Sequence, residues 1–167
     1  MKNITSVFLT RTRLLAVLTI TSLSLGFASA QAADHSLLMS FNEAFTGNNT
    51  LDGDITLTGA FSERGTRHED FTVTGQNHDG SQVYLRGTSL ITTAGGTIMT
   101  EFNGTIYFDN ATFNDTQLAY IEGRESITGG TGIYIGATGH GTFEATIDFD
   151  SGNTLGVFEA NDVHIHH

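Results

Sequence analysis

The chain has 167 residues and a formal net charge of −11, and it contains no cysteine, no proline and no tryptophan. Three of its seven basic residues lie before residue 14, so residues 31–167 keep four arginines against eighteen acids, a net charge of −14. The missing cysteines exclude disulfides, thiolate zinc sites and cysteine nucleophiles. The acidity argues against nucleic acids and anionic membrane surfaces as partners.

Residues 1–30 are predicted to be a cleavable export signal. Basic residues precede the apolar run 14–27, and a small-x-small site follows at residues 28–30. The run is short for a bilayer span and contains several Thr and Ser residues. We therefore expect cleavage after Ala30, no membrane insertion, and a secreted or periplasmic protein of bacterial type with one folded domain over residues 34–167.

The rest of the chain is predicted to be all-β. Thr, Ile, Phe, Val and Tyr, which suit pleated, half-buried surfaces, make up 49 of the residues in 31–167. Period-two alternation of apolar and polar residues recurs, and no stretch sustains a helical repeat. In chain order, strands are expected at 37–41, 53–62, 71–77, 82–91, 97–108, 116–127, 131–149 and 155–167.

The fifth of these segments alternates most clearly, with Ile98, Phe102, Ile106 and Phe108 on one side. Glycines within the strands are expected to mark bends or bulges where a small barrel turns its corners. These glycines are Gly59, Gly87, Gly104 and Gly123.

Eight short-connected strands predict an antiparallel meander that closes into a single calycin-like β-barrel. Closure removes the free sheet edges, and eight strands enclose room for side chains or one small ligand. The Ile/Leu/Phe face should point inward. The predicted aromatic lining consists of Phe61, Phe102, Phe108, Phe143 and Phe149.

Residues 127–139, Ile-Thr-Gly-Gly-Thr-Gly-Ile-Tyr-Ile-Gly-Ala-Thr-Gly, are similar to the GGTG-x-aromatic-x-x-A-x-G signature of the dirigent and allene-oxide-cyclase barrel superfamily. The resemblance implies an eight-stranded barrel with an apolar cavity and a homo-oligomer, a trimer or a dimer. Plant members steer the coupling of phenoxy radicals or cyclise an unstable fatty-acid epoxide. Thr138 stands where plant dirigent proteins have arginine, and the first-strand aspartate has no clear counterpart, so no catalytic residue is carried over.

Strand parity places several charged residues on the apolar face: Glu43, Glu69, Glu122, Arg124 and Glu159. A carboxylate inside a barrel is costly unless paired, and a buried acid with a raised pKa can exchange a proton with a ligand. The alternative is that these residues lie at the barrel mouths.

Among these charged residues, Glu122 and Arg124 are the first catalytic candidates, together with Tyr120, because an acid and a cation in adjacent inward positions can satisfy each other. Glu43 and Glu122 are expected to join the phenylalanines in binding a ligand.

The C-terminal residues His164 and His166 lie on the same strand face, about 6.5–7 Å apart, a spacing that allows a shared zinc or copper ion. No third ligand is identifiable in the sequence, and no other cofactor is expected.

Four functions follow from these observations. The preferred one is a binding module that holds a small apolar or aromatic molecule in its lumen. The others are an isomerase or cyclase of the allene-oxide-cyclase type, a structural envelope protein, and a metal-buffering protein that uses the C-terminal histidines. Since such barrels serve many functions, the fold does not choose among them.

Overall fold

The computed structural model describes residues 35–164, so the predicted export signal at residues 1–30 and the candidate metal ligand His166 lie outside the described residues. Eight strands follow one another in chain order, with one short α-helix and one 3-10 turn between them. They are β1 (His35–Gly47), β2 (Thr50–Gly59), β3 (Glu63–Gln76), β4 (Gln82–Thr93), β5 (Gly96–Tyr107), α1 (Asn110–Thr116), β6 (Leu118–Gly130), η1 (Gly132–Tyr134), β7 (Gly139–Asp148) and β8 (Asn153–Val163).

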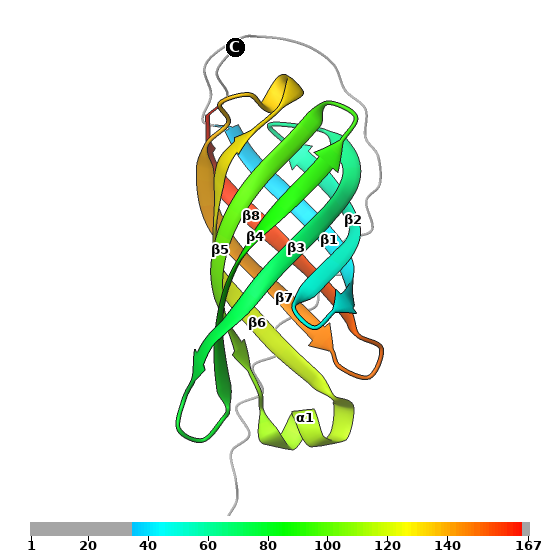
Figure 1. The fold of residues 1–167 in the computed structure, drawn as a ribbon, viewed down its shortest axis with the longest axis vertical. Coiled ribbons are helices and arrows are strands. Elements are labelled where there is room, and N and C mark those ends of the chain that lie inside the picture. Colours follow the sequence, from blue (N-terminus) through cyan, green and yellow to red (C-terminus); the bar gives the residue numbers. More distant parts are fainter. Residues whose placement is uncertain (1–34, 165–167) are drawn as a thin grey trace, which may run out of the picture. The chain divides into compact units, whose positions relative to one another are not determined.

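Each strand pairs antiparallel with the next, and β8 returns to pair with β1, so the sheet forms a closed barrel (Figure 1). Closure leaves none of these strands with a free edge, because each strand is hydrogen-bonded to a neighbouring strand on both sides. The prediction of an all-β, eight-stranded antiparallel barrel is confirmed. Within residues 35–164, no helix is long and apolar enough to cross a membrane.

The connection between β6 and β7 differs from the predicted strand that starts at Thr131. Residues 132–134 form the 3-10 turn η1 instead, and β7 begins only at Gly139. Gly132 and Gly136 have φ values of 62° and 72°, which belong to the left-handed region that glycine tolerates best. The glycines therefore turn the chain back over one end of the barrel, and the next strand starts later than predicted.

Helix α1, which the alternation did not predict, lies at the other end of the barrel (Figure 1). Its Phe113 ring packs edge-on against Phe108 and Phe149, with centroid distances of 5.1 and 5.6 Å. A seven-residue helix is too short to be stable by propensity alone. The packing of Phe113 on the other aromatic rings at this end of the barrel stabilises the helix.

Inward residues alternate along every strand and form one apolar core, which includes Met39, Leu57, Ile98 and Phe158. In the middle of the wall, Gly104 on β5 and Gly123 on β6 face each other and lie against the Phe143 ring. A Cβ atom on Gly123 would lie 2.5 Å from this ring. Glycine is therefore required there to seat the phenylalanine.

The predicted bends at Gly87, Gly104 and Gly123 do not coincide with the register shifts, which occur beside Phe45, Val73 and Met99 and near the start of β1. The inward glycines leave space for side chains instead.

The two barrel ends are covered differently. At the η1 end, Tyr134 is fully buried, contacts Phe61 at 4.5 Å between centroids, and donates a hydrogen bond to Glu63 at 2.8 Å. Burial raises the pKa of Tyr134 to about 12. The α1 end carries the aromatic cap, which we define as Phe45, Phe71, Phe108, Phe113 and Phe149.

Candidate functional site

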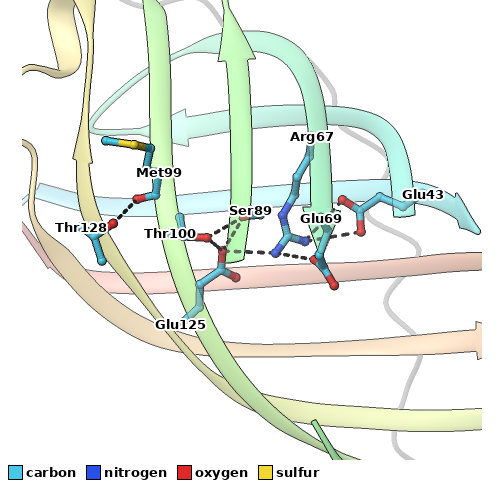
Figure 2. Close-up of polar contacts among 8 residues, drawn as sticks. All are labelled: Glu43, Arg67, Glu69, Ser89, Met99, Thr100, Glu125 and Thr128. Carbon is cyan, nitrogen blue, oxygen red and sulfur yellow. Dashed lines mark hydrogen bonds and ion pairs between the residues drawn. The ribbon is translucent and has the colours of Figure 1, made fainter. Parts of the chain in front are cut away.

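Four charged side chains meet inside the barrel: Glu43 from β1, Arg67 and Glu69 from β3, and Glu125 from β6. The exposed fractions of these side chains are 1%, 3%, 12% and 0%. We call these four residues the lumen charge cluster (Figure 2). Charged residues are seldom buried so completely unless they are paired, so the cluster is the most unusual feature of the interior.

Arg67 is the centre of the cluster. Its Nη1 lies 3.4 Å from both carboxylate oxygens of Glu43, and its Nη2 lies 2.8 Å from Glu69 Oε2 and 3.2 Å from Glu125 Oε1. The guanidinium carbon also lies 5.0 Å from the ring centroid of Phe41. One cation thus joins three strands that are far apart in the sequence.

Glu125 is held from its other side by two hydroxyl groups. Its Oε1 accepts hydrogen bonds from Thr100 at 2.6 Å and from Ser89 at 3.5 Å, and these two hydroxyls lie 2.5 Å apart (Figure 2). Among the described residues, Glu125 Oε2 and Arg67 Nε have no hydrogen-bond partner. The charges of the cluster are therefore paired, but two of its hydrogen-bonding atoms remain without a partner. The cluster can thus bind a further polar group.

The cluster contains three carboxyl groups for one guanidinium, so full ionisation would leave excess negative charge in a buried site. Burial raises the pKa of Glu69 to about 8, although Arg67 acts in the opposite direction. Burial also raises the pKa of Glu43. For Arg67, burial favours the neutral form, but the attraction of the carboxylates outweighs it and raises the pKa. Near neutral pH, Glu69 therefore holds a proton and Arg67 keeps its charge.

A cavity of about 40 Å³ adjoins the lumen charge cluster. Glu43, Arg67 and Glu69 lie on its wall, and it extends to Phe45 and Phe71 of the aromatic cap. The remaining wall is mainly apolar. The volume admits a few waters or a small group and is far below the several hundred Å³ of a site for a drug-sized molecule.

Thr154 on β8 lies on the cavity wall and is the register partner of Glu43 on β1. This residue is 6% exposed, and its Oγ1 has no hydrogen-bond partner in the part of the chain that the structure describes. A buried hydroxyl without a partner is costly, so this position also favours a polar guest.

Sequence reasoning located part of this site. Glu43 and Glu69 face inward, as their parity predicted, and Phe102 and Phe143 line the cavity.

Three other predicted lining residues do not reach the cavity. Phe61 is buried against Tyr134 at the η1 end, while Phe108 and Phe149 belong to the aromatic cap. Phe149 follows β7 and is 41% exposed.

The prediction that Glu122 and Arg124 point into the lumen is wrong. Both side chains are exposed on the outer face of β6, while Ile121 and Glu125 point inward. Tyr120, the third member of that group, shares the outer face and donates a hydrogen bond to a glutamate on β7. Strand β6 carries large apolar residues on both faces, so its parity was assigned to the wrong one.

Glu159 was likewise expected inside together with Val157. The structure places Phe158 and Ala160 in the core and leaves Glu159 exposed. The inward face of β8 is therefore the opposite of the expected one.

Two residues of the lumen charge cluster were missed. Arg67 lies two positions before Glu69, and Glu125 lies two positions before Ile127, so each shares a face with a residue that proved to be buried. The alternation of inward and outward residues along each strand therefore indicated that both side chains point inward. Their meeting around one guanidinium depends on the closed barrel.

His164, one of the two candidate metal ligands, pairs through its backbone with Thr138, and its side chain is exposed. Between residues 35 and 164, no three His, Cys, Asp or Glu side chains gather as a metal site would require.

In comparisons with known proteins, no protein-family model matches the chain, and no curated protein matches it.

Proposed function

We propose that the protein is a binding barrel that holds a small, mainly apolar molecule in its lumen. The observation that carries the proposal is the apolar cavity whose wall includes part of the lumen charge cluster. A cavity with mostly apolar walls and a few converging polar groups is the usual form of a small-molecule site. A buried carboxyl with a perturbed pKa next to it is a further mark of such sites.

The chemistry of the wall favours a ligand with a hydrogen-bond donor at one end. Glu43 and Glu69 supply carboxyl oxygens, and Thr154 supplies a hydroxyl without a partner. Acids outnumber Arg67, so a carboxylate or phosphate would be repelled, whereas a hydroxyl or amine would be accepted. Because the cavity of about 40 Å³ has room for only a few non-hydrogen atoms, a short alcohol or amine is the appropriate size class.

The similarity of residues 127–139 to the dirigent and allene-oxide-cyclase signature supports the same proposal, since those barrels act on apolar or aromatic molecules. Under this proposal the chain is a dirigent-like member of that superfamily, and it assembles as a homo-oligomer. Binding is by shape and burial, at about 25 cal/mol per Å² of ligand surface removed from water.

We expect ethanol to bind the full chain about tenfold or more tightly than propane, which has the same number of non-hydrogen atoms, because only the alcohol can donate a hydrogen bond to the cluster. Amide NMR shifts should locate the alcohol at cavity residues such as Ile121 and Ala145. Ala145→Val narrows the cavity and should weaken binding about tenfold. Thr146→Val, its matched control on the outer face, should not. Equal binding by the two variants, or shifts confined to surface amides, would refute the proposal.

A second candidate function is an isomerase or cyclase. It is favoured by Glu69, whose raised pKa keeps a proton beside the cavity near neutral pH. Such a group can give a proton to a bound substrate and take one back. Glu69→Gln keeps the shape but removes the exchangeable proton. Loss of turnover with retained affinity indicates catalysis, and unchanged chemistry in the variant argues for binding alone.

The proposal also includes export of the protein from the cytoplasm. We expect the protein recovered from its native host to begin at Gln31, because the signal-like segment ends in a small-x-small site. Intact-mass spectrometry of the secreted and periplasmic fractions measures the N-terminus. A variant with Ala28→Leu and Ala30→Leu, which blocks the small-residue site, should stay uncleaved. A cytoplasmic protein that still carries Met1–Ala30 would contradict export.

A further inference from the structure

The outer surface of the barrel has a broad hollow of about 920 Å³ over strands β3 to β8. We call it the outer groove. It is separate from the lumen site and takes in Tyr120, Glu122 and Arg124, the residues that the sequence had suggested for the interior. Its lining includes three tyrosines, three glutamates, three threonines, two arginines and one asparagine.

Three tyrosines provide flat aromatic surface in the outer groove. Tyr107 on β5 and Tyr120 on β6 are register partners, with ring centroids 6.3 Å apart, and Tyr84 on β4 is 38% exposed. The Tyr107 hydroxyl donates to Glu122 at 3.1 Å, and the Tyr120 hydroxyl donates to Glu144 at 2.7 Å. These hydrogen bonds fix the orientation of both rings, so little order is lost when a ligand stacks on them.

Hydrogen-bond donors and acceptors lie in adjacent rows of the outer groove. Arg86, Asn103 and Arg124 are register partners on β4, β5 and β6, and neighbouring strands are about 4.8 Å apart. Neither arginine forms an ion pair with another described residue. The next row contains Glu122 and Glu144, which are also register partners. A ligand lying across these strands thus meets donors on one side and acceptors on the other.

We infer that the outer groove binds an uncharged oligosaccharide. A sugar hydroxyl both donates and accepts hydrogen bonds, so it suits rows of arginine and asparagine next to rows of glutamate. The apolar faces of sugar rings suit fixed tyrosine rings. Sheet faces of other small barrels bind oligosaccharides in this way.

Other polymers fit the outer groove less well. An anionic polymer would meet Glu122, Glu144 and Glu159, which outnumber the two arginines. A peptide commonly binds by adding a strand to a sheet edge or by placing apolar anchors in pockets. The closed ladder β1–β8 leaves no such edge in the described barrel, and Val157 is the sole aliphatic side chain on the outer face of the groove.

The test titrates the full chain with four hexasaccharides: β-1,4-glucose, α-1,4-glucose, β-1,4-xylose and β-1,4-N-acetylglucosamine. Calorimetry and amide NMR shifts give affinity and location. At least one probe should bind with shifts across β4 to β7. Tyr84→Ala and Arg124→Gln should each weaken it about tenfold. Arg64→Gln, an exposed arginine on β3 outside the outer groove, is the matched control and should leave affinity unchanged.

Two results would overturn the inference. One is that none of the four probes binds at about 10 mM. The other is that binding persists in the folded Tyr84→Ala/Arg124→Gln double variant. Shifts produced by an unfolded peptide but by no sugar would assign the outer groove to a different ligand class and equally refute the proposal. None of these outcomes depends on binding in the lumen, because ethanol probes that site separately.

Discussion

Arg67→Met is expected to destabilise the barrel by about 3–5 kcal/mol at pH 7, because it leaves buried carboxyl groups without their cation. Glu43, Glu69 and Glu125 all lose the same partner, and each is buried. They can avoid the penalty only by taking up protons, so the loss should grow as the pH rises. Urea unfolding at pH 5, 7 and 9 measures both effects.

A second variant keeps this prediction testable if Arg67→Met does not fold. This variant combines Arg67→Met with Glu43→Gln, Glu69→Gln and Glu125→Gln, so that no buried carboxylate is left without a cation. It should regain most of the stability that Arg67→Met loses. Arg64→Gln controls for the removal of an exposed arginine from the same strand and should change stability by less than about 0.5 kcal/mol. A folded Arg67→Met protein within about 1 kcal/mol of wild type would show that the cation is not needed to keep the carboxyl groups buried.

The combined variant also bears on function. Buried ion clusters are often no more stabilising than neutral replacements of similar volume. If the variant without charges is as stable as wild type, the lumen charge cluster is not required for folding. Its position on the cavity wall then points to ligand recognition, in agreement with the proposed function.

Glu69→Gln is expected to be more stable than wild type at pH 9 and close to it at pH 5. The folded pKa of Glu69 is about 8, above the ordinary value of 4.5, so the folded state binds this proton more tightly than the unfolded state. Wild-type stability from this group is therefore fully present below about pH 4.5 and is lost as the pH rises to about 8. The loss amounts to roughly 5 kcal/mol at most.

Chemical denaturation of both proteins from pH 5 to pH 9 measures the difference. The stability of Glu69→Gln should fall less steeply between pH 5 and about pH 8, since its amide does not ionise and can still accept a hydrogen bond from Arg67. Glu122→Gln, an exposed acid on β6, should follow the wild-type curve. Parallel curves for wild type and Glu69→Gln would mean that Glu69 is already ionised at neutral pH. The proton-exchange role proposed for it would then fail.

The wrong assignments share one cause. Strand parity is a choice between two faces, and it is read from local contrast between apolar and polar residues. On β6, Leu118 and Tyr120 are on one face, while Ile121 and Ile127 are on the other, so the contrast is weak. On β3, Arg67 lies on the same face as Glu69, but a charged residue gives no apolar signal that it is inside.

The aromatic residues illustrate a second limit. The sequence marked Phe102 and Phe143 as inward, and both line the cavity. It also marked Phe108 and Phe149, but whether an inward ring lines a cavity or covers a barrel end depends on its height along the barrel. That height follows from register and strand tilt, which no single strand determines.

The sequence by itself determined the all-β class, the eight strands, their closure into a barrel, and the inward direction of Glu43 and Glu69. These properties arise from alternation and from the need to remove sheet edges. Only the tertiary structure decided that Glu43, Glu69 and Glu125 meet around Arg67, and that the remaining cavity measures about 40 Å³. Those contacts join strands far apart in the sequence, so they exist only once the β8–β1 ladder closes and the side chains pack.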